Sequence, residues 1–205
     1  MSGFVAAGRP VSRETIARLE AYEALLHRWS PRINLVAAST LAEARTRHFA
    51  DSAQLIDLAP PEAGLWADLG SGAGFPGLVI AVLAAEERPG MKVTLVESDA
   101  RKAAFLAAVL RETGVAANVL TARAEDIAPL GADVVSARAL APLPHLLSLA
   151  VRHLAPGGVC LFPKGAGHGA ELARARESWS FDLRTHPSRT DPQGVVLEIR
   201  SPRHE

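Results

Sequence analysis

Asp68-Leu69-Gly70-Ser71-Gly72-Ala73-Gly74 is the stretch of this sequence that decides its fold. It begins within a short apolar run at residues 65–69, which predicts a buried strand, and it precedes an apolar segment at residues 76–85, which predicts a helix. Glycine permits the sharp turn between them and lets a ligand approach the backbone beside the unpaired N–H groups of a helix N-terminus. The stretch therefore predicts a strand–turn–helix unit that holds a cofactor.

The rest of the chain repeats this alternation. Further strands are predicted at residues 93–96, 118–121, 133–136 and 159–162, and further helices at residues 100–113 and 143–154. Such a pattern indicates right-handed βαβ units on a parallel sheet. Two last strands, at residues 181–185 and 195–200, have a turn-rich stretch but no helix between them, so we expect an antiparallel hairpin at the sheet edge. The expected fold class is α/β, with a Rossmann-like, mostly parallel sheet.

An amphipathic helix is predicted at residues 12–29, ahead of the sheet. Ser12 is a suitable N-cap, and we expect Pro31 to end the helix. A second helical region, which we expect to be broken, follows at residues 40–58, with Thr40 and Glu43 at capping-box spacing. We therefore expect residues 1–60 to form a helical extension packed on the core, and residues 61–205 to form one compact α/β domain.

The overall composition narrows the class of protein. The 205 residues are 48% hydrophobic, their charges sum to zero, and no apolar run approaches the length of a membrane span. Cys160 is the one cysteine, which excludes an internal disulfide framework and a multi-cysteine metal site, so we expect no metal. Residues 1–8 lack the pattern of a secretion signal. We expect a cytoplasmic monomer.

The glycines of the turn fit two cofactors. Gly70, Gly72 and Gly74 have the spacing of S-adenosylmethionine-dependent methyltransferases, whereas Gly72-Ala73-Gly74-Phe75-Pro76-Gly77 also fits the dinucleotide fingerprint. Asp68 favours the former, because a carboxylate there can face the sulfonium and ammonium groups, while it would repel a pyrophosphate. Glu97, at the end of the second strand, can bind the ribose hydroxyls in both.

A short-chain dehydrogenase would also need a catalytic Tyr-x-x-x-Lys. The single tyrosine, Tyr22, lies in the first predicted helix with no lysine near it. We therefore predict S-adenosylmethionine as the cofactor. Ala124 and Glu125 follow the third strand, at the strand ends where ligands lie in this architecture, and they can contact the adenine. Glu125 and Asp126 could instead cap a short helix.

Residues that would identify the methyl acceptor are few. The fourth strand ends in Ser136-Ala137-Arg138-Ala139, without the Pro-Pro-aromatic motif of enzymes that methylate exocyclic amines. Cys160 lies in an apolar strand, as expected of a small hydrophobic residue and not of a nucleophile. The absence of a general-base constellation suits an acceptor with a free lone pair, such as guanine N7. Arg138 could pair with the cofactor carboxylate, bind the base, or form a salt bridge with Asp133 or Glu97.

Several segments together resemble the glucose-inhibited division protein B family, which methylates guanine N7 in the 530 loop of bacterial 16S ribosomal RNA. The similarity covers roughly residues 12–165 in the family's order. Glu97 stands where the family usually has Asp, and Ala137 is inserted into the usual Ser-Arg. The similar segments are Asn34-Leu35-Val36, Arg47-His48-Phe49-Ala50-Asp51-Ser52, residues 68–77, residues 93–98, residues 101–106, Ser136-Ala137-Arg138-Ala139 and Lys164-Gly165.

The resemblance implies methyl transfer from S-adenosylmethionine to N7 of the guanine at position 527, by in-line displacement without a general base. It implies a partner, 16S ribosomal RNA in the small subunit or its precursor, and a catalytic role for Arg138. It also implies cofactor contacts at Gly70, Phe75, Ala124, Glu125 and Arg138. The Phe75 ring could close over the cofactor, or it could be a core residue.

Basic residues in and near the similar segments are candidates for RNA contacts. Phosphate contacts position RNA without reading its sequence, and any one of these residues could equally be an ordinary solvated charge. His48 and Asp51 lie one helical turn apart, which allows a structural or an RNA-positioning role. Three alternatives stay open: a small-molecule or protein methyltransferase, a nicotinamide-dependent enzyme, and a non-catalytic RNA chaperone. The candidate RNA contacts are Arg45, Arg47, His48, Arg101, Lys102 and Lys164.

Overall fold

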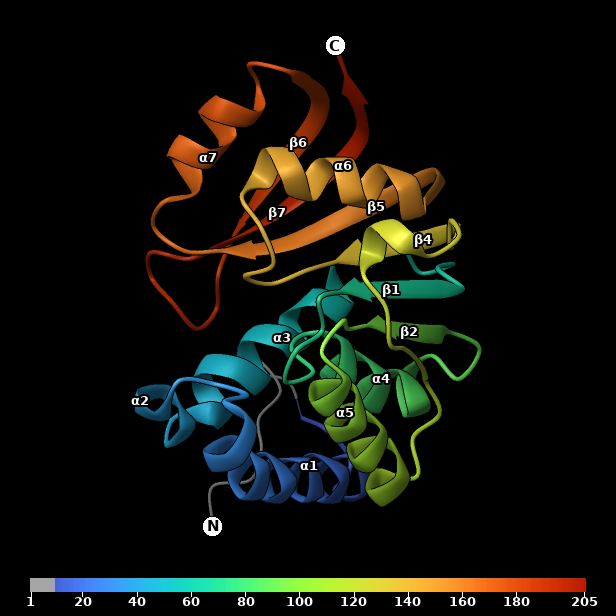
Figure 1. The fold of residues 1–205 in the computed structure, drawn as a ribbon, viewed down its shortest axis with the longest axis vertical. Helices are drawn as coiled ribbons and strands as arrows, with labels where there is room; N and C mark the ends of the chain where they lie inside the picture. Colours follow the sequence, from blue (N-terminus) through green and yellow to red (C-terminus); the bar gives the residue numbers. More distant parts are fainter. Residues whose placement is uncertain (1–9) are drawn as a thin grey trace.

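A seven-stranded sheet runs through the molecule, with helices on both of its faces (Figure 1). The computed structural model describes residues 10–205; residues 1–9 lie outside the described part, and with them the expectation about a secretion signal. The strand order is β3-β2-β1-β4-β5-β7-β6. The strands are β1 (Leu65–Leu69), β2 (Lys92–Val96), β3 (Asn118–Leu120), β4 (Ala132–Ser136), β5 (Leu154–Lys164), β6 (Trp179–Pro187) and β7 (Val195–His204).

The predicted α/β class and the C-terminal hairpin are confirmed. Strands β1 to β5 pair in parallel, and β7 pairs antiparallel with both β5 and β6. Two details differ from the expectation. β5 begins at Leu154, ahead of the predicted strand at residues 159–162, and passes through Pro156-Gly157-Gly158, because an irregular register beside β4 accommodates these residues. Helix α7 (His168–Ala175) was not predicted.

Helix α1 (Arg13–Ile33) begins as predicted and ends later. The Ser12 side chain accepts a hydrogen bond from the backbone N–H of Thr15 and caps the helix. The prediction that Pro31 ends the helix is wrong, because Pro31 lies in the last turn, where it removes a single N–H donor. The helix instead ends at Asn34, which has a left-handed φ of 50°.

The second helical region is broken, as expected, but its predicted cap is wrong. Its pieces are α2 (Ala38–Leu41), the π-helical turn η1 (Arg45–Ala50), α3 (Asp51–Ala53) and the 3-10 turn η2 (Gln54–Asp57). Thr40 lies inside α2 and donates to the carbonyl of Ala37, so it does not cap a helix at Glu43. The π-helical turn brings His48 and Asp51 toward the sheet, where both contact Arg138.

Two apolar cores lie on the two faces of the sheet. Helices α1, α4 (Gly77–Glu87) and α5 (Ala100–Thr113) cover one face, and α6 (Leu143–His153) covers the other (Figure 1). Leu19, Tyr22 and Leu26 of α1 are fully buried in the same core as Trp66 of β1. Within residues 10–205, no helix has both the length and the apolar character needed to cross a membrane.

Candidate active site

The glycine turn joins β1 to α4 at the carboxyl end of the parallel strands. Gly70, Gly72 and Gly74 have positive φ angles of 66°, 56° and 94°, which side chains rarely tolerate. A Cβ on Gly74 would also lie 2.5 Å from the Tyr22 hydroxyl. That hydroxyl donates to the carbonyl of Ala73, so helix α1 holds the turn in place. No sequence pattern indicated this role for Tyr22.

Asp68 is buried beneath the turn instead of facing an open cavity. Its side chain has no exposed surface, and its oxygens accept hydrogen bonds from the Ser136 hydroxyl at 2.7 Å and from the Gly77 backbone N–H at 3.2 Å. Burial raises the pKa of the Asp68 carboxyl to about 6. Contact between Asp68 and a sulfonium stays a prediction; in this structure protein groups surround the carboxyl. Asp68 instead holds the start of α4 against the end of β4.

Glu97 connects the end of β2 to the glycine turn. One carboxylate oxygen accepts from the Gly72 N–H at 2.7 Å and the other accepts from the Asp99 N–H at 2.8 Å. A carboxylate has about four lone-pair sites, so each oxygen can accept a further hydrogen bond. Glu97 thus lies where the sequence placed it, and it retains acceptor capacity for a pair of hydroxyl groups.

A cavity of about 190 Å³ lies at this edge of the sheet, where the parallel strands end. Ala124 and Glu125 belong to a short helical turn, η3 (Ala124–Asp126), and both line the cavity, so they remain candidates for adenine contacts. The Glu125 side chain pairs with Arg123 at 2.6 Å, so its backbone is the part left for a ligand. His153 of α6 supports the turn from below, with Nε2 2.8 Å from the Ala124 carbonyl.

Phe75 lies in the core of this structure, which is the alternative to a ring that closes over a cofactor. The ring is 3% exposed and packs against Tyr22, His48 and Phe49, with centroid distances of 5.1 to 5.5 Å. The Arg138 guanidinium lies over it at 5.0 Å. These partners come from α1, η1 and the end of β4, and together they hold Phe75 away from the cavity.

Arg138 is largely buried and has specific partners. Its Nη1 lies 3.1 Å from His48 Nδ1 and 3.7 Å from Asp51 Oδ2. The alternative of a salt bridge to Asp133 or Glu97 is wrong, because Asp133 accepts from the backbone N–H groups of residues 64 and 65 and Glu97 binds the glycine turn.

His48 is held as a neutral acceptor. Burial lowers its pKa to about 4, and the nearby Arg138 charge contributes. The ring is therefore uncharged near neutral pH, so Nδ1 accepts from Arg138 while Nε2 donates to the Thr40 hydroxyl at 3.0 Å. His48 thereby links Arg138 to the N-terminal helices.

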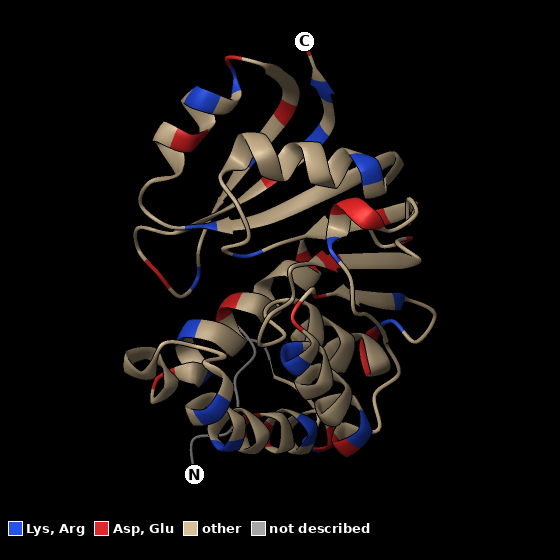
Figure 2. Cartoon of the chain, in the orientation of Figure 1, with Lys and Arg blue, Asp and Glu red and all other residues tan. Residues whose placement is uncertain are grey.

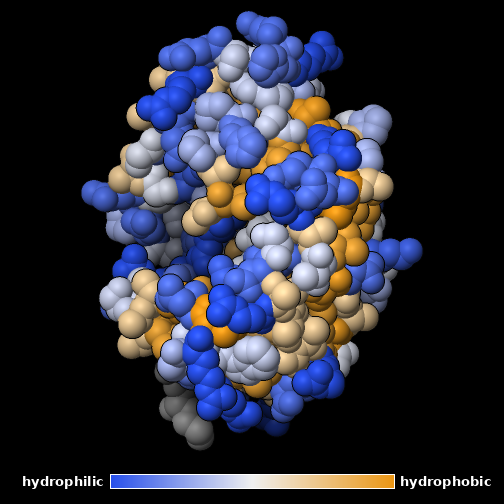
Figure 3. Space-filling model, viewed as in Figure 1, coloured by the Kyte–Doolittle hydropathy of each residue, from blue (hydrophilic) through white to orange (hydrophobic). Residues whose placement is uncertain are grey.

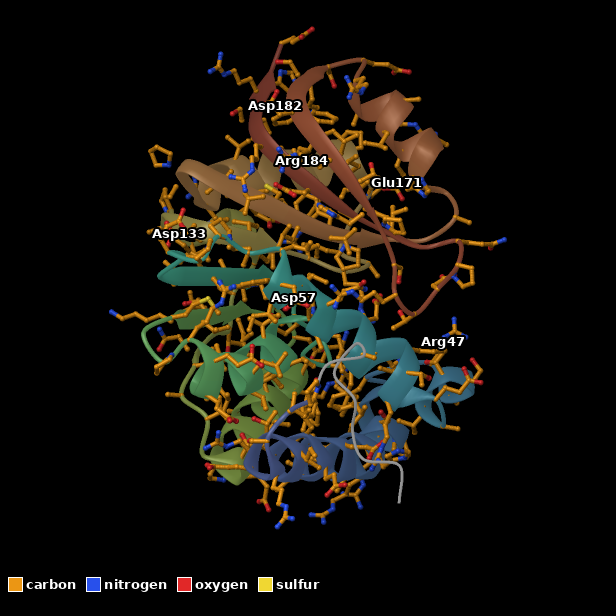
Figure 4. The ribbon with its side chains drawn as sticks, turned by 180° about the vertical axis from the view of Figure 1, so that it is seen from behind. Arg47, Asp57, Asp133, Glu171, Asp182 and Arg184 are labelled. Carbon is orange, nitrogen blue, oxygen red and sulfur yellow. The ribbon has the colours of Figure 1, made fainter. Side chains whose placement is uncertain are left out.

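A groove of about 1120 Å³ opens on the other side of Arg138. Its walls come from η1, the loop after β4, the end of β5, α7 and the β6–β7 turn. In Figure 4, Arg47 and Glu171 lie on the two sides of this groove with the β6–β7 turn between them, and Figure 3 shows a hollow bordered by hydrophilic residues. Leu140 and Ala141 line both the groove and the smaller cavity, so the two meet at this loop.

The predicted RNA contacts are spread over several surfaces. Arg47 and Lys164 line the groove, but Lys164 pairs with Glu171 at 2.7 Å and is 10% exposed. Arg45 pairs with Glu23 of α1 at 2.6 Å. Arg101 and Lys102 lie in the first turn of α5, where Arg101 pairs with Asp99 at 3.3 Å. Lys/Arg and Asp/Glu alternate over the helices in Figure 2 and form no single basic face on the part drawn.

Cys160 is inert, as predicted. It is fully buried in β5, and burial raises the pKa of its thiol to about 12. A thiol that stays protonated is a poor nucleophile. Cys160 therefore belongs to the core of the α6 face and takes no part in the site.

The strand order, the glycine turn and the cavity at the carboxyl edge define the Rossmann-like fold of class I methyltransferases. Solved structures with the same fold include a S-adenosylmethionine-dependent methyltransferase from Aquifex aeolicus, with a TM-score of 0.59, 14% identity and coverage of 76% of this chain and 92% of that one. Another is the Bacillus cereus O-methyltransferase in complex with S-adenosylhomocysteine, with a TM-score of 0.57, 14% identity and coverage of 94% and 92%.

Residues 15–191 match the GidB family, described as rRNA small subunit methyltransferase G, and the chain belongs to this family. Two similar proteins carry the name ribosomal RNA small subunit methyltransferase G. The protein from Cereibacter sphaeroides is 50% identical over 204 residues, covering 100% of this chain and 99% of the relative. The protein from Rhodospirillum centenum is 58% identical over 189 residues, covering 92% and 85%.

Proposed function

We propose that this chain transfers a methyl group from S-adenosylmethionine to N7 of a guanine in 16S ribosomal RNA, the guanine at position 527. The observation that carries the proposal is the meeting of two cavities at Leu140 and Ala141, one fitted to a nucleoside and one a large polar groove. Membership of the GidB family supports the ribosomal RNA substrate. The specific base rests on the sequence resemblance described above.

The residues around the smaller cavity fit the cofactor. Glu97 has spare acceptor sites for the two ribose hydroxyls, and the backbone groups of Ala124 and Glu125 border the space for the adenine. Gly70 carries no side chain toward the cavity, so a ligand can approach its backbone. Asp68 and Gly74 support the turn from beneath, and Arg138 would supply a cation for the cofactor carboxylate.

When bound, S-adenosylmethionine supplies an electrophilic methyl group on a positively charged sulfur. Guanine N7 has a lone pair and no proton, so the chain needs only to align the base, exclude water and keep the two partners in line. The described groove agrees with this requirement. Two of its carboxylates already have partners: Asp51 accepts a hydrogen bond from Gln54, and Glu171 pairs with Lys164.

We infer that the partner is 16S ribosomal RNA in the small subunit or its precursor, and that the protein acts as a cytoplasmic monomer. Arg47 and Arg174 line the groove and can neutralise RNA phosphates entering it. Arg101 and Lys102 border the opposite end of the site, at the start of α5. Residues 1–60 and 61–205 would act as one unit, because both groups of residues contribute walls to the groove.

A labelled-methyl assay tests the proposal. Purified protein and labelled S-adenosylmethionine are incubated with naked 16S RNA, small-subunit precursors and mature subunits from a strain that lacks the modification. We expect label in at least one of these, mapped to N7 of a single guanine in the 530 loop. The Arg138→Ala variant, with native folding checked by circular dichroism, serves as the inactive control. An active-site-competent preparation that binds the cofactor but labels none of these RNAs would refute the proposal.

A further inference from the structure

The groove contains a donor and an acceptor set side by side. Arg138 Nη1 and Asp51 Oδ2 are 3.7 Å apart, and the side chains are 21% and 17% exposed, so both are held firmly yet reach the groove. Asp51 Oδ1 accepts from Gln54 at 2.8 Å, Thr190 at 3.1 Å and Ser188 at 3.4 Å. By contrast, no residue among 10–205 donates a hydrogen bond to Oδ2.

Within the described part of the chain, Asp51 Oδ2 has only the Arg138 guanidinium beside it and faces the groove, so it can accept a hydrogen bond from a ligand there. Burial raises the pKa of the Asp51 carboxyl, while the Arg138 charge opposes that effect. Arg138 likewise keeps N–H groups beyond the one that His48 accepts. The pair therefore has one acceptor and at least one donor available to a ligand in the groove.

We propose that Asp51 and Arg138 together read the target base, with Arg138 donating to O6 of guanine and Asp51 Oδ2 accepting from its N1–H. O6 and N1–H are adjacent on the guanine ring, an acceptor beside a donor, and the protein presents the complementary order. Adenine presents the reverse order, an amino donor beside the N1 acceptor, so it would set donor against donor and acceptor against acceptor. This inference rests on the proposed function and assigns Asp51 as its specificity-determining residue.

The orientation is compatible with methylation of N7. A base whose O6 and N1 edge faces Asp51 and Arg138 has N7 next to O6, on the side where Leu140 and Ala141 separate the groove from the cofactor cavity. Leu140 is one of the two large apolar side chains exposed among residues 10–205, at 38%. An exposed apolar side chain at this position can pack against the face of an unstacked base.

The first test uses the unaltered protein and changes the base. Inosine keeps O6 and N1–H but lacks the 2-amino group, whereas adenine reverses the edge. We expect 16S RNA with inosine at the target position to be methylated within about threefold of the guanine RNA, and adenine RNA to be at least tenfold slower. A loss with inosine as large as that with adenine would show that the 2-amino group is read instead, and would overturn the inference.

The second test uses Asp51→Asn. The asparagine keeps one side-chain oxygen to accept the hydrogen bonds from the β6–β7 turn, and it replaces Oδ2 with an amide group that donates. We expect kcat/KM on guanine RNA to fall roughly 10- to 100-fold, the usual effect of one lost base contact, with the dissociation constant for S-adenosylmethionine unchanged. The ratio of adenine to guanine methylation should rise. An unchanged ratio would overturn the inference, even if overall activity fell.

Two matched variants separate base reading from other effects. Glu43→Gln removes the same charge from an exposed carboxylate that also lines the groove, and it should leave the adenine-to-guanine ratio unchanged. Ser188→Ala with Thr190→Val removes hairpin contacts to Asp51 Oδ1 but leaves Oδ2 intact, and it should also preserve the ratio. A wild-type protein that binds the cofactor but methylates no form of 16S RNA overturns the proposed function and this inference with it.

Discussion

Asp68 and Arg138 are ionisable side chains buried close to the glycine turn, and each affects the other. Burial is the main influence on both: it raises the pKa of the Asp68 carboxyl and lowers that of the Arg138 guanidinium, while each charge favours ionisation of the other. Asp68 has no exposed surface, whereas Arg138 reaches the groove. Asp68 positions the backbone of the turn, and Arg138 is positioned by His48 and Asp51 at the edge of the groove.

The buried carboxyl of Asp68 should make stability depend on pH in a defined direction. Its pKa is about 3.9 in an unfolded chain and about 6 in the folded protein. The folded state therefore binds the proton more tightly, so the contribution of Asp68 to stability is complete below pH 4 and is lost as the pH rises through 6. Asp68→Asn cannot ionise and lacks this dependence.

We expect the free energy of unfolding of the wild type, relative to Asp68→Asn, to fall by roughly 2–3 kcal/mol between pH 4 and pH 7. Urea unfolding of both proteins across this range measures the difference. A difference that stays constant with pH would show that the Asp68 carboxyl is already ionised, with an ordinary pKa, in the folded protein.

Single residues were predictable where a strand end defines their position. Glu97 follows directly on β2 and Arg138 lies two residues beyond β4, so a parallel sheet brings both to the ligand edge. The burial of Phe75 was not predictable, because the direction of its ring depends on Tyr22 and Phe49, which are distant in the sequence. The partners of Arg138 were likewise invisible, since His48 lies 90 residues away.

At the level of elements, helix α1 does more than cover the sheet. Tyr22 reaches from its middle to the glycine turn, and it stacks on Phe75 at a centroid distance of 5.5 Å. Burial raises the pKa of the Tyr22 hydroxyl, which keeps it protonated and able to donate. The N-terminal helices therefore help to shape the cofactor site.

Tyr22→Phe should weaken cofactor binding and stability together. The change leaves the Ala73 carbonyl buried without its donor, which costs about 1–3 kcal/mol. Urea unfolding and calorimetric titration with S-adenosylmethionine measure the two effects. Trp29→Phe is a suitable control, because Trp29 lies on the same helix but packs on Phe105; it should leave the affinity for the cofactor unchanged. Equal affinities for wild type and Tyr22→Phe would contradict a role in holding the turn.

Regular elements with clear periodicity were predictable, and irregular ones were not. The alternation of apolar strands and helices gave the parallel sheet, because each element buries a face defined by its own residues. The π-helical turn at Arg45–Ala50 and the early start of β5 depend instead on packing against neighbours. Helix α7 was not predicted, because its eight residues are mostly small or charged.

At the scale of the whole molecule, the N-terminal helices and the sheet share one core. Leu19, Tyr22 and Leu26 are fully buried in it. Large side chains of this kind contribute about 1.5–3 kcal/mol each when buried, so together they supply roughly 5–9 kcal/mol. That is comparable to the total stability of an ordinary domain.

A fragment of residues 61–205 should therefore fail to fold by itself. We expect it to lack a cooperative urea transition and to bind S-adenosylmethionine at least 100-fold more weakly than the full chain, which is the control. Circular dichroism and calorimetry measure both properties. A fragment that unfolds cooperatively and binds the cofactor normally would show that the N-terminal helices are an independent addition.

Strand β7 lies between β5 and β6, although it is the last of the three to be synthesised. While the chain is still emerging from the ribosome, β6 has no neighbour to pair with, and the β6–β7 turn cannot reach Asp51 and Gln54. The groove is therefore completed only once β7 has been synthesised and has paired with β5 and β6. A premature stop codon before β7 would spare the glycine turn but leave the protein without one wall of its proposed RNA groove.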